Sequence, residues 1–419
     1  MLASGTRGDV QPCCALGAGL QNAGIPVVVA AASRYQAMVE SSGVGFAPLE
    51  GNPSDVMRER SGAMAVSLRG GVLQGIAATA RFLRAAQAEY ARMLTSAAAA
   101  CAGARAIVVG LASTWGVSIA EALGVPAVFC MLQPWSRTRA FPSPLLPLRG
   151  SLGGLYNAAS YRVIEQAMWQ PWRRVTNAWR RETLGLPPLP AAGPWKSLYA
   201  RGFTCLHGFS PSVLPPPADW PASHRVTGYW FLDSGVDRAP GAQLQEFLSS
   251  GKDRPLYIGF GSMGMDPGAL AVIREALEAA DMRAIVSADP TERTRQICEG
   301  SSRILVAEDI RHDWLFPRVS AVVHHGGAGT TAEGLRAGVP SIIVPGASDQ
   351  YFWGQRIARL GAGPRPLGRR QFNAGNLSAL FRQAAGDGRF RGRAQQLAEL
   401  IRSEDGVAAA VAALLPLLS

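Results

Sequence analysis

The segment from residue 321 to residue 350, AVVHHGGAGTTAEGLRAGVPSIIVPGASDQ, has the composition of an anion-binding turn. An apolar run ends at His324 and His325, a glycine-rich turn follows, and a helix is predicted to open near Thr330. Glycines let the backbone approach a ligand closely, and the free N–H groups and dipole of a new helix favour an anion. A lone glycine would indicate only a tight turn, but the whole segment favours phosphate binding. The glycines of this turn are Gly326, Gly327 and Gly329.

Three polar residues follow at positions where their side chains could contact a bound ligand. Glu333 would lie one turn into the predicted helix, and Asp349 and Gln350 come after the next apolar strand. Open α/β sheets bind ligands at the carboxyl ends of their strands. Because sugar hydroxyls both donate and accept hydrogen bonds, an adjacent carboxylate and amide suit them. The sequence therefore predicts a sugar-binding pair beside a phosphate-binding turn.

A second glycine-rich loop, GFGSMG at Gly259–Gly264, matches the G-x-G-x-x-G pattern of dinucleotide sites. Such a site also needs an acidic residue at the end of the next strand, about 20 positions further on. Here the next strand closes at Asp289, which is too late, and Glu278 falls inside a predicted helix. We therefore expect a loop that approaches a phosphate, with Ser262 as donor. A nicotinamide-dependent oxidoreductase remains the alternative interpretation of this loop.

The segment SGTRGDVQP, Ser4–Pro12, is a third turn that follows a predicted strand. It carries Asp9, which would repel an anion but could accept a proton from a hydroxyl group. An aspartate here could equally cap the following helix. The sequence alone does not decide whether Asp9 is a catalytic base or a helix cap.

Residues that could hold a metal ion are not grouped. The chain has no Asp-x-Asp pair, and its six cysteines are scattered, without a Cys-x-x-Cys pair. Neither a carboxylate site for a divalent cation nor a zinc site or disulfide framework is indicated. We expect no metal and no other cofactor.

The net charge of the chain limits the classes of partner that it is expected to bind. The formal net charge is +11, but no compact basic run with interleaved aromatics is present, which disfavours nucleic-acid binding. A solvated arginine-rich surface is the simplest explanation, and attraction to an anionic ligand or membrane surface stays open. No stretch of about 18 uninterrupted apolar residues and no signal-peptide pattern is found. These features predict a cytoplasmic protein.

Short apolar runs alternate with helical stretches, which is typical of parallel α/β units. Predicted helices cover Val72–Ala100, Leu155–Leu184, Ala269–Ala280, Thr330–Ala337 and Phe390–Ser419. The predicted strands are Met1–Ser4, Val27–Ala30, Ala106–Val109, Ala127–Met131, His224–Thr227, Leu256–Gly259, Ala284–Ser287, Ile304–Val306, Ala321–His324 and Ser341–Val344.

Two halves of the chain repeat one pattern. In Glu121–Phe129 and again in Glu333–Val344, a helix ends at glycine and a Val-Pro pair leads into an apolar strand. Glycine ends a helix in a left-handed cap, and proline prevents its continuation. We expect two Rossmann-like domains, with a proline-rich irregular stretch between residues 186 and 221. The predicted division is a domain at 1–231, a linker at 232–240, a domain at 241–395 and a terminal helix at 396–419.

The run RHDWLFPRVSAVVHHGGAGTTAEGLRAGVPSIIVPGASDQYFWGQRIARLGAG, Arg311–Gly363, resembles the family 1 glycosyltransferases of GT-B fold. Its HDWLF and FWG elements are most similar to the sterol glucosyltransferase branch and to bacterial natural-product enzymes. SGTRGDVQP, MLQPWSRTRAFP (Met131–Pro142) and GFGSMGMDP resemble segments of the same branch. The resemblance implies two Rossmann-like domains facing across a cleft, with a C-terminal helix crossing back. It also implies inverting, metal-independent transfer of a hexose to an acceptor hydroxyl. The first expectation for the donor is uridine diphosphate glucose.

The resemblance also implies roles for single residues. Asp9 matches the family's catalytic base, Glu333 the ribose-binding acid, and Asp349 with Gln350 the pair that binds donor-sugar hydroxyls. Related sequences read VPFFGDQ, whereas here Gly346 and Ala347 leave room beside the sugar. The positions that match phosphate contacts are Ser262, His325, Gly327, Gly329 and Thr330.

The expected partners are a nucleotide sugar and an apolar acceptor such as a sterol, lipid or polyketide. We expect Trp135, Arg137 and Phe141 to bind the acceptor, because the loop that carries them is rich in aromatic residues. Aromatics that simply fill the core would explain the same pattern. A non-catalytic auxiliary protein is a further alternative, against which the retention of Asp9 and His325 argues. A peripheral membrane contact stays open.

Overall fold

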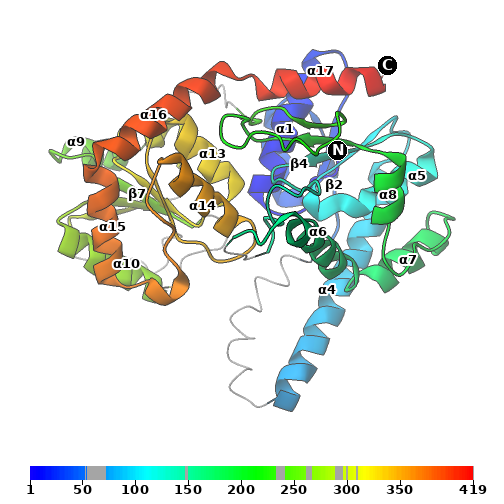
Figure 1. Ribbon diagram of the computed structural model, residues 1–419, viewed down its shortest axis with the longest axis horizontal. Coiled ribbons are helices and arrows are strands. Elements are labelled where there is room, and N and C mark those ends of the chain that lie inside the picture. Colours follow the sequence, from blue (N-terminus) through cyan, green and yellow to red (C-terminus); the bar gives the residue numbers. More distant parts are fainter. Residues whose placement is uncertain are drawn as a thin grey trace.

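The computed structural model describes residues 1–51, 53, 72–146, 150–232, 241–260, 267–287, 296–298, 301–307 and 310–418. Within residues 72–100, side chains are described from residue 84 on. Figure 1 shows two α/β lobes, one for each half of the chain, with the terminal helix α17 lying along the N-terminal lobe. Both lobes are built on parallel sheets, which confirms the predicted fold class.

The N-terminal sheet is continuous through one residue of the first strand. Leu2 bridges to Ala30 and to Val109, so it joins a two-stranded and a four-stranded sheet in the order β2-β1-Leu2-β3-β4-β5-β6. The predicted strand Met1–Ser4 is thus reduced to this bridge. The strands are β1 (Val28–Ala31), β2 (Gly45–Pro48), β3 (Ile107–Val109), β4 (Ala127–Met131), β5 (Thr204–His207) and β6 (His224–Val226).

The C-terminal sheet has the order β11-β10-β7-β8-β9, with all pairs parallel. In both sheets the first strand of the lobe lies in the middle, next to the fourth. This change of direction is the point where doubly wound sheets bind ligands. The strands are β7 (Leu256–Gly259), β8 (Ala284–Ser287), β9 (Ile304–Ala307), β10 (Val322–His324) and β11 (Ser341–Ile343).

Most predicted strands agree with the structure to within one residue, but β2 and β5 were not predicted. β2 contains Gly45 and Pro48, both unusual in strands, and is only half-buried. β5 lies in the proline-rich stretch that we expected to be irregular, yet Cys205, Leu206 and His207 in it are buried. Tertiary pairing with β4 therefore overrides the local composition.

The helices cover the sheets on both faces. The N-terminal lobe has α1 (Arg7–Asn22), α2 (Gln36–Ser41), α4 (Val72–Ala100), α5 (Val117–Leu123), α6 (Gly154–Trp169), α7 (Arg173–Glu182) and α8 (Trp195–Arg201). The C-terminal lobe has α9 (Ala242–Ser249), α10 (Pro267–Ala280), α12 (His312–Leu315), α13 (Ala328–Arg336), α14 (Gln350–Leu360), α15 (Ala374–Gly386) and α16 (Gly388–Ser403). The last helix, α17 (Gly406–Leu418), lies on the N-terminal lobe. Short 3₁₀ turns lie at Ser33–Tyr35, Leu111–Gly116, Phe316–Arg318 and Arg369–Gln371.

Two helix ends confirm the repeat seen in the sequence. Gly124 follows α5 with φ +65°, and Gly338 follows α13 with φ +70°. Both are left-handed conformations that glycine adopts at little cost, and the Val-Pro pair then starts the next strand. The predicted helix Leu155–Leu184 is divided into α6 and α7 by a turn at residues 170–172.

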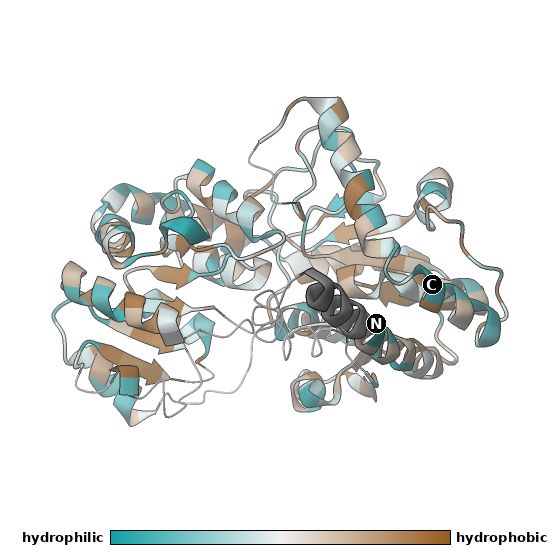
Figure 2. Cartoon of the chain, turned by 90° about the horizontal axis from the view of Figure 1, so that it is seen from below, coloured by the Kyte–Doolittle hydropathy of each residue, from teal (hydrophilic) through white to brown (hydrophobic). Residues whose placement is uncertain are grey.

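Apolar clusters lie on both faces of each sheet. Along β7, Leu256 and Ile258 pack against α10 and α15, whereas Tyr257 faces the opposite layer with Phe316. This alternation is the period-two pattern of a strand buried on both sides. Figure 2 shows the sheets as brown, apolar layers between helices with teal outer faces.

The end of the chain crosses from one lobe to the other. α16 packs on α13 of the C-terminal lobe through Leu397 and Ile401, and α17 packs on α1 through Ala410 and Leu414. The predicted single helix Phe390–Ser419 is broken between the two, so residues 406–418 make the contact with the N-terminal lobe. Of the predicted linker at 232–240, residues 233–240 lie outside the described residues.

The crossing is held by a close backbone contact. A Cβ atom at Gly406 would lie 2.3 Å from the carbonyl oxygen of Tyr229 and 2.5 Å from the carbonyl carbon of Gly228. Glu404 accepts hydrogen bonds from the hydroxyls of Ser210, at 2.7 Å, and Ser212, at 2.9 Å. The outgoing and returning segments therefore touch, and the returning one is tied to the N-terminal lobe.

In the part of the chain that is described, no helix is both long and apolar enough to span a bilayer. The cysteines are all free, and five of the six are buried.

Candidate active site

Asp9 lies in the first turn of α1 and is folded back onto Thr6. Its Oδ2 accepts hydrogen bonds from the Thr6 backbone N–H, at 2.7 Å, and from the Thr6 hydroxyl, at 2.9 Å. Gly5 makes this possible: it has φ +124°, and a Cβ atom there would lie 2.5 Å from Asp9 Oδ2. Asp9 is therefore part of the helix cap that the sequence left open. The cap uses Oδ2, so a role for the other oxygen is compatible with it.

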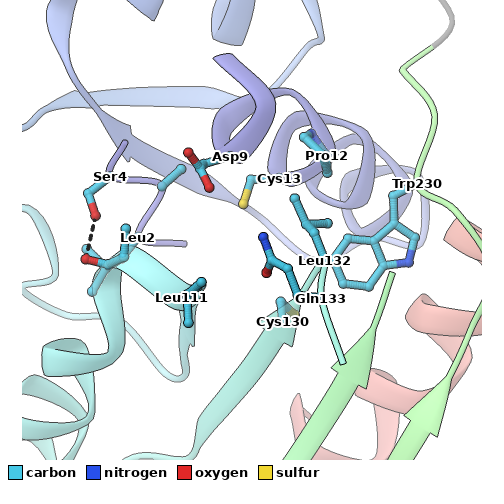
Figure 3. Close-up of a pocket in the computed structure, with 13 residues that line it drawn as sticks. Leu2, Ser4, Asp9, Pro12, Cys13, Leu111, Cys130, Leu132, Gln133 and Trp230 are labelled. Carbon is cyan, nitrogen blue, oxygen red and sulfur yellow. Dashed lines mark hydrogen bonds between the residues drawn. The ribbon is translucent and has the colours of Figure 1, made fainter. Parts of the chain in front are cut away.

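A small pocket opens beside Asp9 at the carboxyl edge of the N-terminal sheet (Figure 3). Its walls come from the first strand, from the loop after β3 and from the end of β4, so it lies where the strand order changes direction. Ser4 Oγ donates to the Ala112 carbonyl at 2.9 Å and joins two of these walls. The side chains that line the pocket include those of Asp9, Cys13, Leu111, Cys130, Gln133 and Trp230.

Burial affects the proton affinity of two side chains that line this pocket. It raises the pKa of the Asp9 carboxyl, and the two hydrogen bonds from Thr6 partly offset the rise. It also raises the pKa of the Cys13 thiol to about 12, so that this side chain is a neutral wall at physiological pH. Asp9 is thus the group of this pocket that can take up a proton.

The glycine-rich turn of the C-terminal lobe follows β10. Gly326 has φ +89°, and a Cβ atom there would lie 2.7 Å from Ile343 Cγ2 and 3.0 Å from the Gln350 carbonyl oxygen. A Cβ atom at Gly327 would lie 2.4 Å from His325 Nε2. Gly326 therefore requires glycine for its backbone angle, whereas a side chain at Gly327 would have to displace the His325 ring that lies over it.

The two adjacent histidines are not equivalent. His324 is fully buried, and its Nδ1 accepts a hydrogen bond from the Gly326 N–H at 3.1 Å. His325 is half-buried beside the turn, and its buried Nδ1 has no hydrogen-bond partner among the described residues. Burial lowers the pKa of His325 to about 4, so that the ring is neutral in the free protein. His325 is therefore the histidine that can donate to a ligand at the turn.

α13 begins at Ala328, two residues before the predicted start, with Gly327 as its N-cap. Gly329 is exposed in the first turn, and a Cβ atom there would meet no atom within 4 Å. Thr330 and Glu333 are both half-buried on this short helix. The open space at Gly329, next to free backbone N–H groups, suits an anion. Ser262 and most of the loop Gly259–Gly264 lie outside the described residues.

Asp349 and Gln350 begin α14 after β11, and both are nine-tenths buried. Asp349 Oδ2 accepts a hydrogen bond from the Trp353 indole at 3.1 Å. Gln350 Oε1 accepts the backbone N–H groups of Gly346, at 2.8 Å, and Ala347, at 3.0 Å. The glutamine therefore shapes the loop that carries the aspartate. Ser348 has φ +55°, a left-handed conformation at the position where the related pattern VPFFGDQ has glycine.

The two lobes meet around Asp349. Burial raises the pKa of its carboxyl to about 6, with a smaller contribution from the negative charge of Asp9. A hydrogen bond from the Gln133 side chain acts in the opposite direction. Trp353 also packs edge-on against Phe209 of the N-terminal lobe, at 5.8 Å between ring centroids. The turn that carries Asp9 and the loop that carries Asp349 are therefore close enough, across the junction of the lobes, for their charges to interact.

Gln133 and Trp353 are the residues that sequence reasoning missed. Gln133 stands in the segment MLQPWSRTRAFP, two residues after β4, and a polar residue at that sheet edge was the available signal. Its backbone carbonyl lies 3.1 Å from the buried His207 Nδ1, which fixes the loop. Trp353 follows Asp349 by four residues, so one helical turn brings the indole to the carboxylate.

The three residues expected to bind the acceptor have different surroundings. Trp135 is 3% exposed and packs against Trp195, and Arg137 forms a two-pronged ion pair with Glu165. Phe141 is half-buried and packs against Phe352 of the C-terminal lobe, at 5.5 Å. Their role toward an acceptor stays a prediction, and Phe141 is the one at a junction of the lobes.

Among the described residues there is no group of three or more histidine, cysteine, aspartate or glutamate side chains that could hold a metal ion. The chemistry that these residues offer is proton acceptance at Asp9, anion binding at the turn before α13 and hydroxyl recognition at Asp349.

Both halves of the chain match known domain families. Residues 1–142 match the glycosyltransferase family 28 N-terminal domain. Residues 273–415 match the C-terminal domain described as erythromycin biosynthesis protein CIII-like. The first match includes Asp9 and the residues that line its pocket apart from Trp230, and the second includes the turn before α13 and Asp349.

The chain is also similar over nearly all its length to sterol 3-beta-glucosyltransferases. It is 36% identical to that of Aspergillus fumigatus over 428 residues and 33% identical to that of Debaryomyces hansenii over 438 residues, in each case 99% of the chain. It spans only 29% and 26% of the length of these two relatives.

Solved structures share the whole fold. The glycotransferase of kitacinnamycin has a TM-score of 0.70 at 17% identity, covering 100% of this chain and 98% of that one. A calicheamicin glycosyltransferase has a TM-score of 0.69 at 16% identity, covering 100% and 97%. The glycosyltransferase VinC in complex with dTDP has a TM-score of 0.66 at 19% identity, covering 100% and 98%. The chain therefore combines these two matched domains in the GT-B fold that the solved glycosyltransferases share.

Proposed function

We propose that this chain transfers a hexose from a nucleotide diphosphate sugar to a hydroxyl group of an apolar acceptor, with inversion at the anomeric carbon. The observation that carries the proposal is the meeting of two half-sites. A carboxylate that can take up a proton lies in the N-terminal lobe, and its charge affects Asp349 beside the anion-binding turn of the C-terminal lobe.

In the proposed reaction Asp9 accepts the proton of the acceptor hydroxyl. The acceptor oxygen forms a bond to the anomeric carbon as the bond from that carbon to the diphosphate oxygen breaks, and the electron pair leaves with the nucleotide diphosphate. Burial raises the proton affinity of Asp9, which favours this step. The Thr6 hydrogen bonds hold Oδ2 and orient the carboxylate.

The leaving diphosphate would be held by the start of α13. Backbone N–H groups at Gly327 and Gly329, the Thr330 hydroxyl and the His325 ring are the proposed donors, and the helix dipole adds to the stabilisation. A diphosphate beside His325 would raise the low pKa of that ring, because a nearby negative charge favours the protonated form. These groups would do without a metal ion what a divalent cation does in other transferases. Glu333 is assigned to the ribose, and Ser262 to a further phosphate contact.

The proposed donor is uridine diphosphate glucose, and the proposed acceptor is a sterol, lipid or polyketide hydroxyl. The similar sterol 3-beta-glucosyltransferases support the glucose and the apolar acceptor. The thymidine diphosphate bound by structural neighbours makes deoxysugar donors the competing choice. Asp349 and Gln350 are assigned to the sugar hydroxyls, and the acceptor is assigned to the side of the pocket near Phe141.

The test is a transfer assay read by mass spectrometry, with uridine diphosphate glucose, a thymidine diphosphate deoxysugar and a panel of apolar alcohols. Wild type should transfer glucose, also in EDTA. Asp9→Asn should be slower by roughly 100- to 10,000-fold, with unchanged affinity for the nucleotide diphosphate. Asparagine can still accept from Thr6, so the turn should persist.

Asp9→Asn turnover within a few-fold of wild type would contradict the base. A strict requirement for magnesium or manganese would contradict the metal-free leaving group. A preference for the deoxysugar would change the donor but not the reaction. Nucleotide binding without transfer to any alcohol would favour a non-catalytic role.

A further inference from the structure

Helix α6 buries several polar side chains on its inner face. Asn157, Ser160 and Glu165 are buried on it. Asn157 Nδ2 donates to the Arg139 carbonyl at 2.8 Å, and Ser160 Oγ accepts from the Ser143 N–H at 2.7 Å. Glu165 is held by the guanidinium of Arg137. The inner face of α6 therefore holds residues 137–143 by hydrogen bonds. The helix cannot rotate this face outward without breaking them.

The outer face of the same helix is apolar. Leu155, Ala159, Val163 and Ala167 recur every four residues, and all four are exposed. Leu155 is 77% exposed and Val163 57%, and Leu152 just before the helix is 81% exposed. A helix on the surface of a globular protein normally has the opposite arrangement, with its polar stripe outward. A contiguous exposed apolar stripe of this kind marks a surface that binds something.

Positive charge borders the stripe. Arg162 comes just before Val163, and Arg139 lies along the first turn, since a Cβ atom at Gly154 would lie 3.2 Å from Arg139 Cβ. Both arginines are exposed, and Arg162 lies near enough to Glu165 for its positive charge to lower the pKa of that carboxyl. The nearby acids are occupied: Glu165 binds Arg137, and Asp219 accepts from Thr138 and from the Arg139 backbone.

We propose that the outer face of α6 docks this protein on a membrane surface that contains anionic lipid. Leucine and valine would enter the boundary between headgroups and acyl chains, and the arginines would lie among the phosphates, as in interfacial amphipathic helices. A second copy of the chain fits less well, because a two-fold contact through this stripe would bring like charges together.

The position of α6 relative to the Asp9 pocket connects membrane docking with the proposed function. The segment that α6 holds, residues 137–143, continues from the end of β4, where Leu132 and Gln133 line the Asp9 pocket. Figure 1 shows α6 at the lower side of the N-terminal lobe, away from α17. This inference rests on the proposed function only in its consequence, namely that an apolar acceptor dissolved in the bilayer would be near the pocket.

The test is vesicle flotation of the full chain. The probes are phosphatidylcholine vesicles with and without phosphatidylglycerol. The double variant Leu155→Gln/Val163→Gln should bind anionic vesicles at least about tenfold more weakly than wild type, because the apolar side chains no longer enter the bilayer. Arg162→Glu should weaken binding by a factor of about five or more, since each arginine near an anionic surface contributes about that factor.

Matched controls lie on the other lobe. Leu400→Gln removes an apolar side chain that is 48% exposed on α16, and Arg370→Glu makes the same change of net charge as Arg162→Glu. Both should bind vesicles like wild type. Equal loss in the controls, or unchanged binding of the α6 variants, would overturn the proposal. A concentration-dependent dimer that only the α6 variants lose would assign the face to a second copy.

The assay separates this proposal from the proposed function. Vesicle binding is measured without a sugar donor, so it can succeed even if no transfer occurs. Transfer to a short, water-soluble alcohol should be the same in wild type and in Leu155→Gln/Val163→Gln. Transfer to an acceptor held in anionic vesicles should be selectively reduced in the variant.

Discussion

Burial makes the ionised Asp349 carboxylate costly to the fold. Its pKa is raised to about 6, mainly because it is buried, and it retains one indole hydrogen bond from Trp353. A carboxyl whose pKa is higher in the folded than in the unfolded state stabilises the fold at acidic pH. That contribution is lost as the pH rises through about 6. In neutral solution the protein therefore keeps a destabilising charge, as expected of a group retained for binding.

Asp349→Asn should accordingly stabilise the protein in a pH-dependent way. Asparagine can still accept from Trp353 but carries no charge. At about pH 8 the free energy of unfolding should rise by up to roughly 3 kcal/mol, and at about pH 4 it should hardly change. Urea denaturation at the two pH values measures this. Sugar transfer should fall in the same variant, and an equal stabilisation at both pH values would contradict the raised pKa.

His325→Ala should weaken the binding of a nucleotide diphosphate about tenfold, which corresponds to one hydrogen bond to a charged group. In wild type, affinity should also increase as the pH falls, because the bound diphosphate raises the pKa of the ring and binding takes up a proton. The variant should lose this pH dependence. Calorimetry with the diphosphate measures both effects, and the nucleoside alone serves as the control ligand. An unchanged affinity and slope would remove His325 from the site.

At the scale of elements, the turn into α13 contains one glycine that the fold requires and one that the proposed ligand requires. Gly326 has a left-handed backbone and lies against Ile343 and the Gln350 carbonyl, whereas Gly329 has open space around its Cα atom. The first glycine is required by the fold itself. The second is not, and helix propensity alone would favour alanine there.

Gly326→Ala should therefore destabilise the protein by roughly 2 kcal/mol, through backbone strain and the close contact with Ile343. Gly329→Ala, its matched control, should leave stability equal or higher by up to about 1 kcal/mol. It should nonetheless weaken nucleotide diphosphate binding, because the methyl group fills the space proposed for the phosphate. Thermal unfolding and calorimetry on both variants check this. Normal binding by Gly329→Ala would move the phosphate away from α13.

At the scale of the whole molecule, the two lobes are joined where the chain crosses twice. The contact between Gly228 and Gly406 leaves no room for a side chain, and Glu404 fastens the returning segment to two serines. An apolar cluster with Phe209 and Trp353 lies between the lobes. The relative position of Asp9 and Asp349 therefore depends on this junction.

Gly406→Ala should push the two crossing segments apart, because its Cβ atom would meet backbone atoms that cannot rotate away. We expect a loss of stability of about 1–3 kcal/mol and slower transfer, with unchanged affinity for the nucleotide diphosphate, which is bound within one lobe. Gly392→Ala on α16 is the control, since nothing lies within 4 Å of its position. Normal transfer rates in Gly406→Ala would show that the junction does not set the geometry of the site.

The local features of this protein can be predicted from its amino-acid sequence alone. The glycine-rich turns, the strands on either side of them and the helix ends at Gly124 and Gly338 follow from periodicity and from backbone angles that only glycine adopts cheaply. These are short-range properties, so the turn that carries His325 could be located without a structure. The same holds for the cap that Asp9 shares with Thr6, which the sequence left as one of two roles.

Which side chains come into contact could be learned from the folded structure alone. It placed Gln133 at the Asp9 pocket, joined Asp349 to Trp353, buried Trp135 in a core and turned the apolar stripe of α6 outward. It also formed β5 from a proline-rich stretch, because β4 offered a partner. Each outcome depends on contacts between residues far apart in the chain. A local pattern of residue types holds no information about which distant surface will cover it.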